Sequence, residues 1–138
     1  MKRFYIYFVF ICLFASCTQN NGRIGPIFGK WQLREIQSAG NTAKYDSIFY
    51  SFQSNMVELL RLDTVPHKTI RKWGYFTHID DELSLDIRDC SISEIKIYKL
   101  PDTTVHFKVL QLDNRRMTLR LGNDSTYLFW KTGAIGSE

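Results

Sequence analysis

Residues 104–121 read TVHFKVLQLDNRRMTLRL, and this stretch indicates most plainly how the chain folds. Apolar side chains alternate with polar ones on both sides of Asp113-Asn114, a pair of turn-forming residues. Alternation with a period of two is typical of a β-strand that buries one face, and a short turn joins antiparallel neighbours. The stretch therefore predicts a β-hairpin.

The same pattern recurs along most of the chain. Short β-rich segments follow one another at regular spacing, with links of hairpin length between them. Such a series is typical of an all-β, antiparallel fold, either an up-and-down barrel or a sandwich. About eight strands are expected, over residues 29–36, 47–52, 56–62, 70–79, 83–88, 104–112, 117–121 and 127–131.

One segment breaks the strand pattern. Ser91 and Glu94 stand three residues apart, as in a capping box, where each side chain bonds the backbone of the other. Pro101 then ends the run. We expect one short helix over residues 92–100, and an alternation of isoleucines within it leaves a strand as the alternative.

The N-terminus carries a hydrophobic leader. Lys2 and Arg3 precede an uncharged apolar run, Phe4 to Ala15. A spanning helix needs about 20 residues, so this run is too short to cross a membrane and has the length of a signal peptide core.

The end of the leader, Leu13-Phe14-Ala15-Ser16-Cys17, resembles the lipobox of bacterial lipoproteins, with Phe14 in place of the commoner Leu. The resemblance implies a signal peptide over 1–16, acylation of Cys17 and a flexible tether over 17–27. It also implies an outer-membrane anchor facing the periplasm, because an acidic surface-export cluster is absent; surface exposure remains an alternative. An ordinary secretory leader with an unmodified cysteine is the other alternative.

The charge and cysteine content of the chain after the leader limit its possible partners and cross-links. Without Lys2 and Arg3 it has 16 basic and 14 acidic residues, a net charge of +2 instead of +4, with no basic block. A nucleic-acid partner is therefore not expected. After loss of the leader and acylation of Cys17, Cys90 alone remains, which excludes an intramolecular disulfide.

Gly29-Lys30-Trp31 opens the first expected strand. It resembles the Gly-x-Trp motif of the lipocalin and calycin barrels. In that family the Trp plugs one end of the barrel, and a basic side chain after the last strand packs across its ring. Lys131 stands at that position. The resemblance implies a lipocalin-like barrel over 28–133, with a tail over 134–138, and is nearest to small lipoproteins of Gram-negative bacteria.

Large rings on several expected strands suggest a binding cavity. A barrel of eight strands either holds one small ligand or is filled by its own side chains. In the first case the rings would line a site for a small hydrophobic molecule; in the second they form the core. The candidate ligand-binding residues are Tyr50, Phe52, Trp73, Tyr75 and Phe107.

No catalytic or metal-binding pattern accompanies these residues. His67, His78 and His106 lack ligand spacing, and Asp80 to Glu82 reads as a solvated turn. We expect neither an enzyme nor a metal or cofactor. The leading hypothesis is a monomeric, membrane-tethered binding protein for a small hydrophobic ligand. The alternative is a filled barrel that docks an envelope protein partner.

Overall fold

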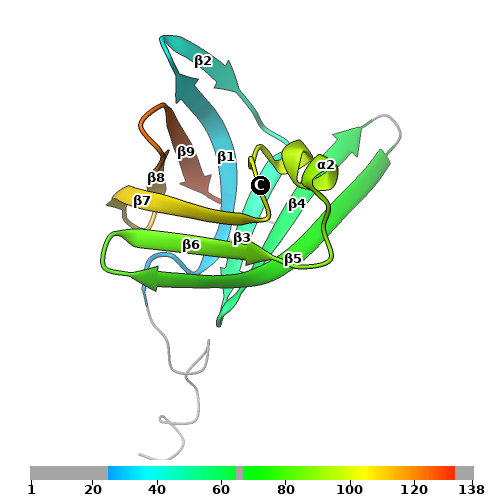
Figure 1. The fold of residues 1–138 in the computed structure, drawn as a ribbon, viewed down its shortest axis with the longest axis horizontal. Helices are drawn as coiled ribbons and strands as arrows, with labels where there is room; N and C mark the ends of the chain where they lie inside the picture. The colour runs from blue at the N-terminus through cyan, green and yellow to red at the C-terminus, as the bar shows by residue number, and fades with distance from the viewer. Residues whose placement is uncertain (1–24, 65–66, 133–138) are drawn as a thin grey trace, which may run out of the picture.

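Eight of the nine strands in the described part of the chain form a closed antiparallel barrel (Figure 1). The computed structural model describes residues 25–64 and 67–132. The expected leader, Cys17 and the C-terminal tail lie outside these residues. The strands are β1 (Gly29–Ser38), β2 (Asn41–Lys44), β3 (Ile48–Gln53), β4 (Met56–Thr64), β5 (His67–Ile79), β6 (Glu82–Ile87), β7 (Thr104–Leu112), β8 (Arg116–Leu121) and β9 (Ser125–Lys131).

Pairing of the first strand with the last closes the barrel. β1 pairs with β3 on one side and with β9 on the other, from Trp31↔Lys131 to Ser38↔Ser125. The register shifts between Leu33 and Glu35, an irregularity that bends a strand and so assists closure. The expected up-and-down barrel of eight strands is confirmed.

β2 is an additional strand that the sequence pattern did not predict. It pairs only with the outer end of β1, from Glu35↔Lys44 to Ser38↔Asn41. All four of its residues are exposed, so it has no apolar alternation that would reveal it. β1 and β2 therefore form a hairpin whose end extends beyond the barrel wall.

A short helical segment covers one end of the barrel. It consists of α2 (Ile92–Ile95) and the 3₁₀ turn η2 (Lys96–Tyr98), and the expected capping box is present. Ser91 Oγ accepts from the Glu94 amide at 3.2 Å, and the Ser91 amide donates to Glu94 Oε1 at 3.1 Å. A short helix in this segment is confirmed, with helical turns over residues 92–98 in place of the expected 92–100, and the strand alternative is wrong.

Two tyrosines of the wall hold this segment, which we call the helical cap (residues 91–100). The Tyr50 hydroxyl donates to the Tyr98 carbonyl at 2.7 Å, and the Tyr127 hydroxyl donates to the Lys99 carbonyl. Ile95, Tyr98 and Leu100 of the cap are buried. Figure 1 shows the cap at the end of the barrel away from the start of β1.

No helix among residues 25–64 and 67–132 combines the length and the apolar character needed to cross a membrane.

Candidate functional site

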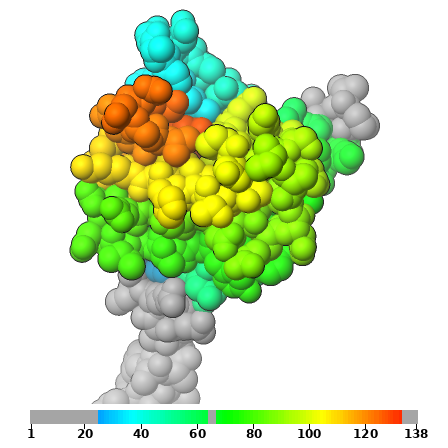
Figure 2. Space-filling model, in the orientation of Figure 1, coloured from blue at the N-terminus to red at the C-terminus, as the bar shows by residue number. Residues whose placement is uncertain are grey.

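Side chains fill the interior of the barrel. Tyr50, Phe52 and Phe107, three of the expected ligand-binding residues, are buried in its core. Their rings lie at 4.9 Å from Phe129, 4.9 Å from Phe76 and 5.3 Å from Tyr127, measured between centroids. Figure 2 shows the helical cap packed onto the neighbouring strands. Each of the three rings therefore packs against another core ring and belongs to the filled interior.

The residues of the Gly-x-Trp motif close the end opposite the helical cap. Trp31 is fully buried, and its Nε1 donates to the Ile27 carbonyl at 2.7 Å. Lys131 Nζ lies 4.9 Å from the Trp31 ring and donates to the Pro26 carbonyl at 2.7 Å. Burial lowers the pKa of Lys131. Gly29 has φ +125°, and a Cβ there would lie 3.3 Å from the Lys131 Cε, so glycine suits both the backbone and the space.

The expected interior position of Trp73 and Tyr75 is wrong. Their side chains are 41% and 40% exposed, on the outer face of β5. Gly74, between them, faces the interior, where a Cβ would lie 2.1 Å from the Asp86 carbonyl oxygen of β6. Because the side-chain period of a strand is two, this glycine forces both rings outward.

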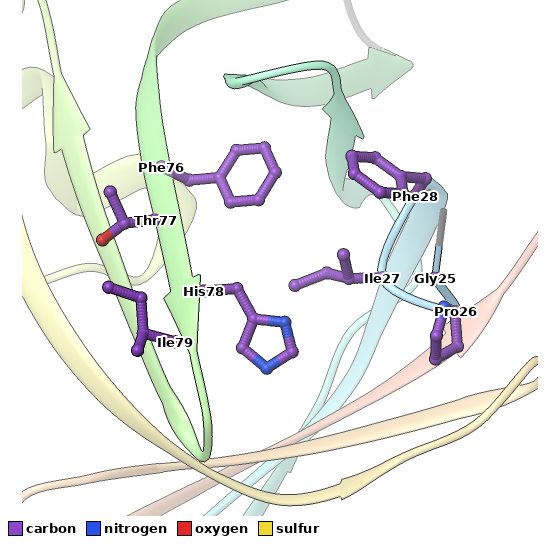
Figure 3. A pocket seen from close by; sticks show the side chains of 8 residues that line it. All are labelled: Gly25, Pro26, Ile27, Phe28, Phe76, Thr77, His78 and Ile79. Atoms are coloured by element: carbon purple, nitrogen blue, oxygen red, sulfur yellow. The ribbon is translucent and has the colours of Figure 1, made fainter. Parts of the chain in front are cut away.

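A pocket of about 580 Å³ lies at the rim of the barrel near Trp31. Residues 25–28, which precede β1, form one wall, and residues 76–79, at the end of β5, form the other. Figure 3 shows Ile27, Phe76 and His78 pointing toward one another across this space, with Thr77 and Ile79 on the other side of the strand. We call it the rim pocket.

The lining of the rim pocket is apolar with one polar side. Ile27 and Phe76 are buried, and the rings of Phe28 and Phe76 meet edge to face with centroids 6.3 Å apart. The half-buried imidazole of His78 offers a hydrogen-bonding nitrogen beside them. The arrangement can bind an apolar molecule and orient one polar group.

No metal site accompanies the pocket in the part of the chain that the structure describes, where no three His, Cys, Asp or Glu side chains gather in a way that could hold an ion. Cys90 is a half-buried free thiol beside the helical cap.

Sequence reasoning missed Ile27, Phe28, Phe76 and His78 as pocket residues. Phe76 and His78 lie on the same face of β5 as Gly74. The large rings of Trp73 and Tyr75 lie on the opposite face, and for that reason the opposite face was predicted to be the inner one. The partner strand carried the signal: Glu58 pairs with Trp73, and a carboxylate must face solvent, which places Trp73 outside as well. Ile27 and Phe28 precede the first strand and carried no periodic signal.

A family model described as a lipocalin-like domain matches residues 12–131, which include every strand of the barrel. The chain belongs to the lipocalin-like domain family. This agrees with the resemblance of its Gly-x-Trp motif.

Two solved structures are similar to this lipocalin-like domain. A lipocalin-like protein from Bacteroides uniformis ATCC 8492 is 26% identical, with a TM-score of 0.69 over 78% of this chain and 99% of that one. An uncharacterized protein from Bacteroides eggerthii DSM 20697 is 30% identical, with a TM-score of 0.68 over 76% of this chain and 98% of that one. No curated protein matches the chain.

Proposed function

We propose that this lipocalin-like domain is a membrane-tethered, non-enzymatic binding protein that holds a small hydrophobic ligand in the rim pocket. The observation that carries the proposal is an apolar hollow of about 580 Å³ beside a core that is otherwise filled. Ligand sites are typically concave, about 300–1,000 Å³ in volume, and mostly apolar with a few polar groups. In this pocket Ile27, Phe28 and Phe76 supply the apolar surface, and His78 supplies the polar group.

The place of the pocket in the fold supports the tether. Cys17, the proposed acylation site, lies eight positions before Gly25, which borders the pocket. An extended chain spans at most about 3.5 Å per residue, so this linker reaches at most about 28 Å. A protein anchored at Cys17 would hold the rim pocket within that distance of the lipid surface, where hydrophobic molecules partition.

The second candidate is a docking module without a small ligand. The filled interior favours it, and so does the cluster of exposed apolar side chains on the outer wall, Met56, Trp73 and Tyr75. Apolar clusters of this kind often mark interaction surfaces.

Binding of a medium-chain fatty acid and of a naphthalene-based fluorescent probe tests the proposal. Phe28→Ala removes apolar surface from the rim pocket and His78→Ala removes its polar group, so each should weaken binding. Ile92→Ala is the matched control, since Ile92 is an exposed aliphatic side chain on α2, in the helical cap at the opposite end of the barrel. Native mass spectrometry of the protein purified from cells reports any ligand that it already carries.

Absence of saturable binding by a folded protein would reject the rim-pocket proposal and favour the docking module. Binding that all three variants retain equally would place the ligand elsewhere.

A further inference from the structure

The outer face of β4 and β5 carries an exposed apolar cluster. Met56, Trp73 and Tyr75 are 43%, 41% and 40% exposed, and Met56 pairs with Tyr75 across the two strands. Trp73 and Tyr75 were predicted from the sequence to bind a ligand, but neither ring is part of the core. Large apolar side chains that gather on a surface indicate an interaction site.

The two rings are held in place. Trp73 and Tyr75 meet edge to face, with centroids 5.6 Å apart and planes at 80°. The Arg88 guanidinium lies 5.5 Å from the Tyr75 ring and is itself fixed by an ion pair with Asp86 at 2.8 Å. A platform that is already ordered loses little conformational entropy when a ligand binds.

Two hollows flank this ring pair. One, of about 400 Å³, lies over β3, β4 and Trp73; the other, of about 290 Å³, lies over Tyr75, β6 and β7. Because the strand order is β3-β4-β5-β6-β7, the hollows lie on opposite sides of β5. The polar lining residues are Ser51, Gln53, Ser54 and Glu58 in the first hollow, and Thr77, Ser84, Asp86, Thr104 and His106 in the second.

The chemistry of these linings selects the ligand. Hydroxyl, amide, imidazole and carboxylate groups donate and accept several hydrogen bonds at once, which an aliphatic ligand cannot use. The Glu58 and Asp86 carboxylates repel an anion, and Arg71 and Arg88 are already paired with them at 3.6 and 2.8 Å. The ligand should therefore be neutral, rich in hydroxyl groups, and provided with an apolar face for the rings.

We propose that the outer face of β3 to β7 binds a neutral oligosaccharide. The apolar face of one sugar ring packs on Trp73, and its hydroxyls bond Glu58, Gln53 and Ser51. A neighbouring sugar extends past Tyr75 toward Asp86 and the Ser84–His106 pair, whose Oγ and Nδ1 are 2.8 Å apart. This site is separate from the rim pocket, and neither needs the other.

Indole N–H resonances in ¹H–¹⁵N spectra of the full-length protein test the proposal. The three tryptophans report separate places: Trp31 in the core, Trp73 at the proposed site, and Trp130 on the outer face of β9. The probes are neutral hexasaccharides of glucose, mannose, galactose and N-acetylglucosamine. At least one should shift the Trp73 resonance saturably while Trp31 and Trp130 stay unmoved.

Variants locate the binding. Trp73→Ala should weaken it about fivefold or more, since the loss of an aromatic contact removes about 1 kcal/mol or more of binding free energy. Trp130→Ala, which removes a ring of similar exposure elsewhere, should leave it unchanged. Gln53→Ala changes one exposed side chain of the first hollow and should also weaken binding, which keeps the test valid if Trp73→Ala does not fold.

The proposal is overturned if no hexasaccharide moves the Trp73 resonance, or if Trp73→Ala and Gln53→Ala bind as well as the parent protein. Trp73-dependent crosslinking to an envelope protein, with no response to any sugar, would also overturn it and assign the face to protein docking.

Discussion

Lys131, the last residue of β9, lies over the ring of Trp31, near the start of β1, and ties both strands to the segment before the barrel. Its Nζ is 4.9 Å from the ring centroid and donates to the Pro26 carbonyl at 2.7 Å. Trp31 Nε1 donates to the neighbouring Ile27 carbonyl at 2.7 Å. The same three contacts therefore close the barrel end and position one wall of the rim pocket.

Trp31→Ala should lower the free energy of unfolding by about 3–5 kcal/mol, because it removes a fully buried ring. Urea unfolding followed by circular dichroism measures the change. Trp130→Ala is the control: Trp130 is 46% exposed and contacts Arg34 and Arg116, so its loss should cost only about 0.5–1 kcal/mol. A cost below about 1 kcal/mol for Trp31→Ala would contradict its role as the barrel plug.

Phe107→Ala should also destabilise the protein by about 3–5 kcal/mol, since Phe107 is buried against Tyr127. Tyr75→Phe removes only an exposed hydroxyl and should change stability by less than about 0.5 kcal/mol. Thermal unfolding of the two variants side by side separates the core ring from the surface ring. Equal destabilisation by both would mean that Tyr75 packs inside.

Tyr127→Phe should loosen the helical cap. It removes the hydrogen bond to the Lys99 carbonyl and leaves that carbonyl without this donor, a loss of about 1–3 kcal/mol. Amide hydrogen exchange should accelerate in residues 91–100 more than in β4 or β5. Uniform acceleration throughout the barrel would show that the cap and the wall open together.

Stability should fall in alkaline solution. Burial raises the pKa of Tyr98 and Tyr127 from 10.0 to about 12, and it raises the pKa of Tyr50 as well. The folded state therefore retains phenolic protons that the unfolded chain has lost, and unfolding becomes easier as pH rises from about 10 to about 12.

Urea midpoints measured from about pH 8 to about pH 12 check this trend. Tyr127→Phe should reduce its slope, because one of the shifted groups is gone. A midpoint that stays constant over this range would contradict the assigned burial of the phenols.

Cys17→Ala should release the protein from membranes if acyl chains on Cys17 anchor it. Two or more chains hold a protein firmly, while each buried methylene contributes about 0.8 kcal/mol. Fractionation of cells, with a high-salt wash of the membranes, measures the distribution. A variant that remains in the washed membrane fraction would refute the lipoprotein hypothesis.

The strand pattern was sufficient to predict an all-β antiparallel fold, because alternation reports which residues share a face. The resemblance of Gly29-Lys30-Trp31 to the Gly-x-Trp motif then favoured a barrel over a sandwich. The capping box at Ser91 and Glu94 likewise predicted the helix, since its two hydrogen bonds depend only on local sequence. Neither signal states which face of a strand is inner. For β5 the face with Trp73 and Tyr75 was predicted to be the inner one. Gly74 lies on the true inner face, where the backbone of the neighbouring strand β6 leaves no room for a side chain.

The rim pocket could not be predicted from such patterns. It forms where the irregular segment of Ile27 and Phe28 meets the end of β5, residues that are about 50 positions apart in the sequence. Only the path of the chain before β1 brings them together, and the bonds to Trp31 and Lys131 that fix this path are tertiary contacts.

The pairing of β1 with β9 determines when this protein can finish folding. Among the strands of the barrel, residues 29–38 come first along the chain and their partner, residues 125–131, comes last. Contacts between distant segments form slowly, and strand edges stay unpaired until they do. The folding chain therefore keeps an open β1 edge until the last strand arrives, and the ring of hydrogen bonds closes only when β9 pairs with β1.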